Sequence, residues 1–411
     1  MNRPFCVSAP GKVILHGEHA VVYGKTALAS SLNLRTRLKL SQTNIKDTAS
    51  FSLPDIGLEL KWRLDDLNKI FVEFLNREAS LDIGPPTVSQ FDKMKEFTKI
   101  SEEGSTKDLA VLAVLYLYVA ILGSNNAISF PATEVQITSE LPTGAGLGSS
   151  AAFSVCLSAA FLTQAGRIIP VEGSNSWKQE DLDLINQWAF EAERIIHGNP
   201  SGIDNAVSTY GGALRYQGKQ IKSLENVPLL RILLINTKIP RSTKVLVAGV
   251  RVKFDKYPAI IGPVFDSIEE IAQKCQLVLE SLVIDKTSKE MGIKQTSIHD
   301  VESHLIKEQG VIHPDQSPYS SLEELIDMNQ KFLEILGVSH PSLEKLCTLT
   351  SQHGLHSKLT GAGGGGCTLT LIRPDTLPDT VIQVKEDVAK LGFDLWETSI
   401  GGIGVAFHAD V

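Results

Sequence analysis

The chain has 411 residues, of which 43% are hydrophobic and 21% charged, the composition of a globular protein with room for two domains. Its 39 Lys and Arg residues against 47 Asp and Glu residues give a net charge of −8 without a basic cluster, which argues against nucleic acid as a partner. Five scattered cysteines indicate reduced thiols rather than a disulfide framework or a zinc site, so we expect a cytoplasmic protein, with a peroxisomal location left open.

The first predicted element is a strand over residues 5 to 9, and no signal-peptide apolar region precedes it. The chain continues as Pro10-Gly-Lys-Val-Ile-Leu-His-Gly-Glu-His19, in which Lys12 stands just before an apolar trio. If the trio is an inner strand, the Lys12 ammonium needs an anion or a cleft, because unpaired burial of a charge is costly. A strand-edge lysine that reaches water is the alternative, and Glu18 and His19 are ambiguous by themselves.

Residues 27 to 40 are predicted to form a further strand, and no motif can be interpreted between residues 41 and 106. Residues 106 to 123 predict a buried helix that begins near Asp108, and its apolar run is too short to span a bilayer. Alternation of polar and apolar residues then predicts a strand over residues 133 to 140. The apolar run from 151 to 165 predicts a helix that stops at Gly166.

The loop Leu141-Pro-Thr-Gly-Ala-Gly-Leu-Gly-Ser-Ser-Ala-Ala152 joins that strand to that helix and is typical of a phosphate-binding loop. Its three glycines allow backbone conformations closed to other residues and bring bare amides close to a ligand. Ser149 and Ser150 begin the helix, whose unpaired N–H groups and dipole favour an anion. An ordinary glycine-rich turn with Ser149 as the helix N-cap is the alternative.

The next predicted helix, over residues 180 to 197, contains Glu191 and Glu193. At 100° per residue Glu191 lies toward the polar face, whereas Glu193 shares an apolar arc relieved only by Asn186. A carboxylate on an apolar arc needs a cation, and a metal ion would serve.

That helix breaks at His197-Gly-Asn-Pro-Ser-Gly-Ile-Asp-Asn205, where Ser201 or Gly202 can begin a short helix with Asp204 in its first turn. Asp204 there either stabilises the helix dipole or serves as a general base or electrostatic anchor. Spacing alone does not choose between these roles.

A second domain is predicted to begin near residue 226, which divides the chain into residues 1–225 and 226–411. Residues 229 to 237 predict a buried strand, and Pro240-Arg-Ser-Thr-Lys244 predicts a turn with two cations that could meet an anionic substrate. The polar stretch from 285 to 320 has little to bury and is interpreted as an exposed insertion or mobile loop. Helices over 322–336 and 340–353 follow, and a last strand ends near His408.

A second glycine run, Lys358-Leu-Thr-Gly-Ala-Gly-Gly-Gly-Gly-Cys367, lies between these helices and the end of the chain. It satisfies G-x-G-x-x-G formally, but a strand rather than a helix follows it and no strand is evident before it, which argues against a dinucleotide site. We interpret the glycines as a wall that approaches the phosphates and substrate held by the first loop.

The three motifs, in this order, resemble the signature motifs of the GHMP small-molecule kinases, and the chain is most similar to the eukaryotic mevalonate kinases of that superfamily. The resemblance runs from about Val7 to the last strand and includes residues 197–205, 236–244 and 396–401. It implies an α+β fold, with an N-terminal domain like ribosomal protein S5 domain 2, a ferredoxin-like C-terminal α/β sandwich, and an active site between them.

The resemblance also implies a reaction: transfer of the ATP γ-phosphate to the C5 hydroxyl of (R)-mevalonate, giving 5-phosphomevalonate and ADP in the isoprenoid and sterol mevalonate pathway. The resemblance implies Mg²⁺ as the cofactor and a homodimer as the assembly. It implies no membrane span. Another GHMP kinase, acting on phosphomevalonate, homoserine or a sugar, is the alternative. A non-catalytic sensor on the same fold is disfavoured because all the motif residues with chemical roles are retained together.

Site residues follow from the resemblance, motif by motif. Asp204 is the expected catalytic carboxylate and Lys12 the cation beside the reacting hydroxyl. Ser150 and Glu193 are expected to hold Mg²⁺. The nucleotide-binding residues are expected to be Glu140, Gly144, Ala145, Gly146, Leu147, Gly148, Ser149 and Ser150. The mevalonate pocket is expected to be lined by His19, Ile196, Thr243, Gly361 and Ala362.

Overall fold

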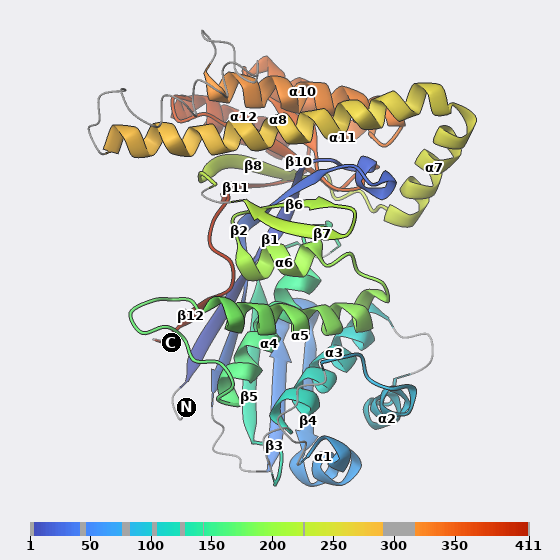
Figure 1. Ribbon diagram of the computed structural model, residues 1–411, viewed down its shortest axis with the longest axis vertical. Helices are drawn as coiled ribbons and strands as arrows, with labels where there is room; N and C mark the ends of the chain where they lie inside the picture. The colour runs from blue at the N-terminus through green and yellow to red at the C-terminus, as the bar shows by residue number, and fades with distance from the viewer. Residues whose placement is uncertain are drawn as a thin grey trace.

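Two long strands, β1 (Phe5–His16) and β2 (Ala27–Ser41), pair antiparallel and run through both halves of the molecule (Figure 1). The computed structural model describes residues 4–41, 47–75, 83–100, 105–123, 128–142, 144–224, 227–290 and 317–409, without the side chains of 284–290. Successive parts of β2 pair with different strands: β6 (Ala213–Gln217), then β11 (Asp394–Ile400), then β5 (Thr133–Ser139). Strand β2 therefore connects the first half of the chain to the last.

The other strands are β3 (Thr48–Leu53), β4 (Leu58–Arg63), β7 (Gln220–Leu224), β8 (Leu230–Asn236), β9 (Ser357–Leu359), β10 (Cys367–Ile372) and β12 (Ala406–His408). The described strands form one sheet with the order β4-β3-β5-β2-β11-β8-β10-β9, which β1, β6, β7 and β12 join at the side. Strand β12 pairs with β1, so the end of the chain returns to its beginning, and N and C lie near each other in Figure 1.

Helices cover the sheet in each half. Those before residue 225 are α1 (Leu64–Ile70), α2 (Val88–Thr98), α3 (Thr106–Leu122), α4 (Ser149–Gln164), α5 (Gln179–His197) and α6 (Ile203–Tyr210), with 3₁₀ turns η1 (Ala20–Tyr23), η2 (Pro54–Ile56) and η3 (Val72–Phe74). Those after it are α7 (Thr243–Lys256), α8 (Pro258–Glu290), α10 (Pro318–Leu336), α11 (Pro341–Gln352) and α12 (Pro378–Lys390). Figure 1 shows α8, α10, α11 and α12 together on one side of β8, β10 and β11.

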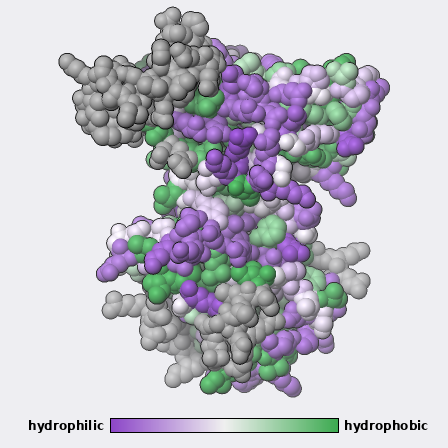
Figure 2. All heavy atoms as spheres, viewed as in Figure 1, coloured by the Kyte–Doolittle hydropathy of each residue, from purple (hydrophilic) through white to green (hydrophobic). Residues whose placement is uncertain are grey.

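The main core is one cluster of buried apolar side chains that extends from Phe5 to Val405 and includes residues of both halves. Helix α3 is buried from Val111 to Leu122, as the sequence predicts, and begins with a capping box between Ser105 and Asp108. No helix among the described residues is long and apolar enough to cross a membrane. The molecule narrows between its halves, and hydrophilic and hydrophobic residues are interspersed on the face shown in Figure 2.

Two expectations about the second half need comment. A short strand, β9, precedes the second glycine run and pairs with β10, so the expectation that no strand stands there is wrong. Both ends of the polar stretch 285–320 are helical, because α8 continues to Glu290 and α10 begins at Pro318. The rest of the predicted insertion, residues 291–316, lies outside the described residues.

Candidate active site

The loop between β5 and α4 holds its three glycines in the left-handed region. The φ angles are +72° at Gly144, +72° at Gly146 and +74° at Gly148, a conformation that costs other residues energy. Gly148 is the N-cap of α4 and no side chain caps this helix, so an ordinary turn capped by Ser149 is the wrong interpretation. Because no side chain caps it, the N-terminus of α4 leaves backbone N–H groups for a ligand beside the glycine loop. Such a helix end is a suitable environment for phosphate.

Lys12 of β1 lies against this loop and close to α6. Its backbone N–H donates to the Leu147 carbonyl at 2.8 Å, and its ammonium donates to the Gly146 carbonyl at 3.0 Å. The ammonium is also 3.4 Å from Asp204 Oδ1, and the Lys12 side chain is 10% exposed. Lys12 is therefore a buried cation with an anionic partner, and the water-reaching strand-edge alternative is wrong.

Asp204 is the second residue of α6, which begins after Gly202. Gly202 has φ +84°, and the chain between α5 and α6 turns there as the glycines and proline of that segment predict. The Asp204 carboxylate is 38% exposed, so one side contacts Lys12 while the other is open to a ligand.

Glu193 of α5 is 3% exposed and accepts hydrogen bonds from Ser150 Oγ at 3.2 Å and Ser154 Oγ at 3.1 Å. Its ion-pair partner among the described residues is His197, whose Nε2 lies 3.8 Å away. Burial, and then the negative charge of Asp204, raise the pKa of Glu193 to about 7, while the two serines and Lys12 act in the opposite direction. The carboxylate thus lacks a strong cation, as its predicted place on an apolar arc implies.

Glu191, expected on the polar face of the same helix, is instead buried at 7% exposure. It forms a pair with Arg194 Nη1 at 3.2 Å, and burial raises its pKa. The prediction for Glu191 was wrong because α5 contacts other elements around more of its circumference than a simple amphipathic helix does.

The second glycine run packs against protein atoms rather than around an open space. A Cβ on Gly363 would lie 2.0 Å from the Val338 carbonyl oxygen, and one on Gly365 would lie 2.8 Å from the Ile239 carbonyl oxygen. Backbone cannot move aside easily, so these glycines are required by close packing. The expected approach to phosphates does not explain these two positions.

Arg241 connects the two glycine loops. Its guanidinium donates to the Ala145 carbonyl at 2.7 Å and to the Thr360 carbonyl at 3.4 Å, and a Cβ on Gly146 would lie 1.9 Å from its Nη2. Among the described residues no carboxylate forms an ion pair with it, and burial lowers its pKa. The sequence marks Arg241 as a cation on a turn but does not place it between the two loops.

The first motif also contacts the third directly. His19, at φ +59°, donates from Nε2 to the Ala362 carbonyl at 2.8 Å, and burial lowers the pKa of its ring. Glu18 and Lys358 form an ion pair in which each side chain is 1% exposed. These contacts bring two predicted pocket residues, His19 and Ala362, together beside a buried pair of charges.

The remaining predicted residues lie around this centre. Ile196 is buried on α5 at 9% exposure, Thr243 is exposed as the first residue of α7, and Gly361 is half-buried beside Arg241. Glu140 is exposed, and its carboxylate accepts from the Arg35 backbone N–H at 2.9 Å. Ser154 and His197, which contact the Glu193–Ser150 pair, were not predicted. Ser154 follows Ser150 by one helical turn, and that spacing was the available signal.

Comparisons with known proteins agree with this geometry. Two family models match: the GHMP kinases N terminal domain over residues 110–212 and GHMP kinases C terminal over residues 315–390. The mevalonate kinases of Bos taurus and Homo sapiens are 49% and 48% identical to the chain, over 99% and 100% of it and 96% of each relative. The chain belongs to the mevalonate kinase family of GHMP kinases. The predicted family and fold class are confirmed.

The fold of this mevalonate kinase family member is also found among solved structures. The L. major mevalonate kinase in complex with R-mevalonate superposes with a TM-score of 0.63 at 19% identity, over 97% of this chain and 96% of that one. At this level of identity the similarity establishes the shared fold alone.

Ser150 with Glu193 offers a place where a hard cation could be held. A hydroxyl and a carboxylate are the oxygen donors that Mg²⁺ prefers, and Glu193 is buried without a lysine or arginine partner. No group of three or more His, Cys, Asp or Glu residues in the described chain could hold a metal by itself. The protein would thus supply two ligands and leave the others to phosphate and water.

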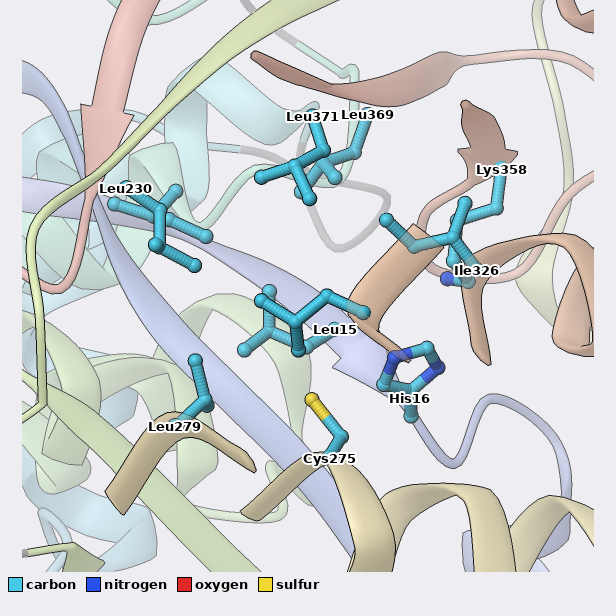
Figure 3. A pocket seen from close by; sticks show the side chains of 11 residues that line it. Leu15, His16, Leu230, Cys275, Leu279, Ile326, Lys358, Leu369 and Leu371 are labelled. Atoms are coloured by element: carbon cyan, nitrogen blue, oxygen red, sulfur yellow. The ribbon is translucent and has the colours of Figure 1, made fainter. Parts of the chain in front are cut away.

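A cavity behind β1 is distinct from this site. It is lined mainly by leucines and isoleucines of β1, α8, α10 and the neighbouring strands, with His16, Cys275 and Lys358 among them (Figure 3). Its volume is ≈ 30 Å³, enough for a few water molecules and far too little for a nucleotide. A nucleotide could therefore not bind in this cavity.

Proposed function

We propose that this chain transfers the γ-phosphate of ATP to the C5 hydroxyl of (R)-mevalonate, giving 5-phosphomevalonate and ADP. The observation that carries the proposal is the Lys12–Asp204 pair, 3.4 Å apart, in contact with the glycine loop. Phosphoryl transfer depends on in-line positioning and charge neutralisation more than on covalent participation by the protein, and these groups supply both. The relatives' names and the R-mevalonate bound to the L. major protein support the acceptor.

In this proposal the nucleotide lies in a site between residues 1–225 and 226–411. Residues 144 to 149 bind its phosphates and Glu140 contributes to the nucleotide site. Ser150 and Glu193 hold Mg²⁺, which would neutralise phosphate charge. Asp204 accepts the hydroxyl proton or orients the hydroxyl, and Lys12 favours the alkoxide form by its positive charge.

The acceptor pocket is proposed to be formed by His19, Ile196, Thr243, Gly361 and Ala362. The acceptor carries a carboxylate, and Arg241 is a half-buried cation whose hydrogen bonds among the described residues go to carbonyl oxygens. Arg241 is thus available to an anionic acceptor. We further propose a cytoplasmic homodimer that acts in the isoprenoid and sterol pathway.

The acceptor assignment is tested by ADP release in a coupled assay with (R)-mevalonate, 5-phosphomevalonate, homoserine and galactose. Mevalonate should exceed the other acceptors in kcat/KM by ~100-fold or more, because a site with placed polar groups rejects acceptors that leave them unpaired. A rate that does not depend on which acceptor is present, or one that is highest with another acceptor, would overturn the proposal.

The role of Asp204 is tested by Asp204→Asn, with Asp379→Asn as its matched control. Both aspartates are the second residue of a helix, so both substitutions remove the same favourable interaction with a helix dipole. Asp204→Asn should lower kcat by ~10²–10⁴-fold with nucleotide affinity kept. Asp379→Asn should leave kcat within about twofold of the wild-type value. If the two substitutions lower kcat equally, Asp204 only stabilises its helix.

A further inference from the structure

The helix that carries Asp204 is short. Helix α6 has eight residues, its N-cap is Gly202, and no side chain caps its N-terminus. Isolated helices of this length are marginal in water, so tertiary contacts must determine where α6 lies. The position of the Asp204 carboxylate relative to Lys12 depends on those contacts.

Ser208 makes one such contact with β1. Its side chain is 0% exposed, and its hydroxyl donates to the Pro10 carbonyl oxygen at 2.7 Å. Ser208 follows Asp204 by four residues and therefore shares its face of α6, while Pro10 precedes Lys12 by two residues on β1. The Ser208–Pro10 hydrogen bond and the Lys12–Asp204 pair are thus two neighbouring links between the same helix and the same strand.

The pairing of β1 with β2 is irregular at this point. The pairing register shifts between Pro10 and Gly11, and the extra residues, Asn33 and Leu34, lie on β2. Strand β1 itself runs without a break from Pro10 to Lys12. The Ser208 hydroxyl therefore holds β1 two residues before Lys12, where its pairing with β2 is interrupted.

Two buried hydroxyls of α4 are satisfied inside their own helix. Ser158 and Thr163, at 0% and 1% exposure, donate to the carbonyls of Ser154 and Ala159, four residues earlier, at 2.8 and 2.7 Å. Ser208 instead bonds to a strand 198 residues away in sequence. The next residue of α6, Thr209, is also buried, and its hydroxyl has no hydrogen-bond partner among the described residues. The Ser208 hydroxyl is thus a link between α6 and β1 rather than a bond within the helix.

We propose that Ser208 is a positioning residue for phosphoryl transfer: its hydrogen bond to Pro10 holds α6 against β1 so that Asp204 and Lys12 keep their reacting geometry. The inference rests on the proposed kinase function. Asn205, beside Asp204 and 1% exposed, links α6 to α5 through Asn186 at 2.7 Å. Ser208 supplies the hydrogen bond to β1, the strand that carries Lys12.

The test compares Ser208→Ala with Ser158→Ala. The second substitution removes an equally buried hydroxyl together with its hydrogen bond to a carbonyl. Both variants should lose similar stability in urea unfolding. Ser208→Ala should in addition lower kcat by ~10–100-fold, with both KM values within about twofold, because small displacements of reacting groups cost that much. Ser208→Thr retains the hydroxyl and should recover at least half of the lost activity.

The inference would be overturned if Ser208→Ala and Ser158→Ala had the same kcat. It would also be overturned if Ser208→Ala changed only KM. If Ser208→Ala does not fold, Ser208→Cys, of similar size and with a weak donor, replaces it and must show the same selective loss of kcat. A wild-type chain without mevalonate-dependent ADP release would instead reject the proposed function, so the two failures are distinguishable.

Discussion

Glu193 is unusual at the scale of single residues, because a carboxylate buried to 3% exposure has two serine hydroxyls and a partly exposed histidine for partners. Burial and the nearby Asp204 raise its pKa from 4.5 to about 7. In the metal-free protein the fold thus favours the protonated form. The stability from this group is fully present below pH 4.5 and is lost as the pH rises through 7.

Glu193→Gln mimics the protonated carboxyl and should remove this loss. Without Mg²⁺ and nucleotide, the variant should be more stable than the wild type at pH 8 by about 3 kcal/mol, and nearly equal to it at pH 4.5, by linkage of the pKa shift to folding. The measurement is urea unfolding of both proteins between pH 4.5 and 8 in EDTA. A stability difference that stays constant over this range would contradict the assignment of a raised pKa to Glu193.

The sequence predicts the identity of the charged residues at the centre better than it predicts their partners. Lys12 and Glu193 could be named as candidates for a charged site because each stands among or beside apolar residues, where a charge needs compensation, although a strand-edge Lys12 that reaches water stayed open as the alternative. Ser208 and Arg241 gave no such signal. Their contacts, with Pro10 and with Ala145 and Thr360, join segments about a hundred or more residues apart, and neither composition nor periodicity reports a pairing of that kind.

At the scale of elements, the second glycine run shows how backbone packing limits a loop. Gly363 has φ +77°, and a Cβ there would lie 2.0 Å from the Val338 carbonyl oxygen, which itself accepts from the Gly364 N–H at 2.8 Å. Gly354, after α11, has φ +71° with no atom near the position of a Cβ. The two glycines share a backbone conformation and differ in the space around them.

Gly363→Ala should therefore be much more destabilising than Gly354→Ala. Both variants incur left-handed strain of about 1 kcal/mol. Only Gly363→Ala must also displace a hydrogen-bonded carbonyl, so its total loss should exceed ~3 kcal/mol. Urea unfolding midpoints with unchanged m-values measure the difference. Similar midpoints for the two variants would show that conformation alone requires a glycine at 363.

Long elements such as α3 and β5 were predictable from their patterns, and several shorter strands were not. The alternation of residues 133 to 140 gives β5, whose Val135 and Ile137 are buried while the residues between them are exposed. Strand β4 also alternates, with Trp62 buried and Glu59 and Lys61 exposed, so the signal was present although no element was predicted there. Strand β9 has three residues, which is too short for any pattern to emerge.

At the scale of the whole molecule, the two halves are joined by continuous structure rather than by a linker. Strand β2 pairs with strands of both halves, β12 returns to β1, and the Thr360 hydroxyl exchanges hydrogen bonds with both backbone groups of Ile14 at 3.0 Å. The predicted division near residue 226 precedes β8, which belongs to the same sheet as the described strands before it. The sequence could not show that the last residues pack on the first strand, because that pairing spans some 400 positions.

The buried Glu18–Lys358 pair lies at this junction, where the first motif meets the third. Both side chains are 1% exposed, and Asn329 of α10 donates to the second carboxylate oxygen of Glu18 at 3.1 Å. A buried ion pair contributes little net stability, because removal of both charges from water offsets their attraction. Removal of one partner is far more costly, because the other charge remains buried without compensation.

Lys358→Met should therefore destabilise the protein by ~3–5 kcal/mol, whereas the double variant with Glu18→Gln should recover at least about half of that loss. Glu18→Gln keeps the oxygen that accepts from Asn329, so the recovery reports the removal of the orphaned charge. Urea unfolding of the wild type, both single variants and the double variant completes the cycle. Because the pair joins the two halves, unfolding should remain a single transition in all four proteins. If the losses of the two single variants add up in the double variant, Glu18 and Lys358 are not coupled. If the two halves unfold in separate transitions, they are stabilised independently.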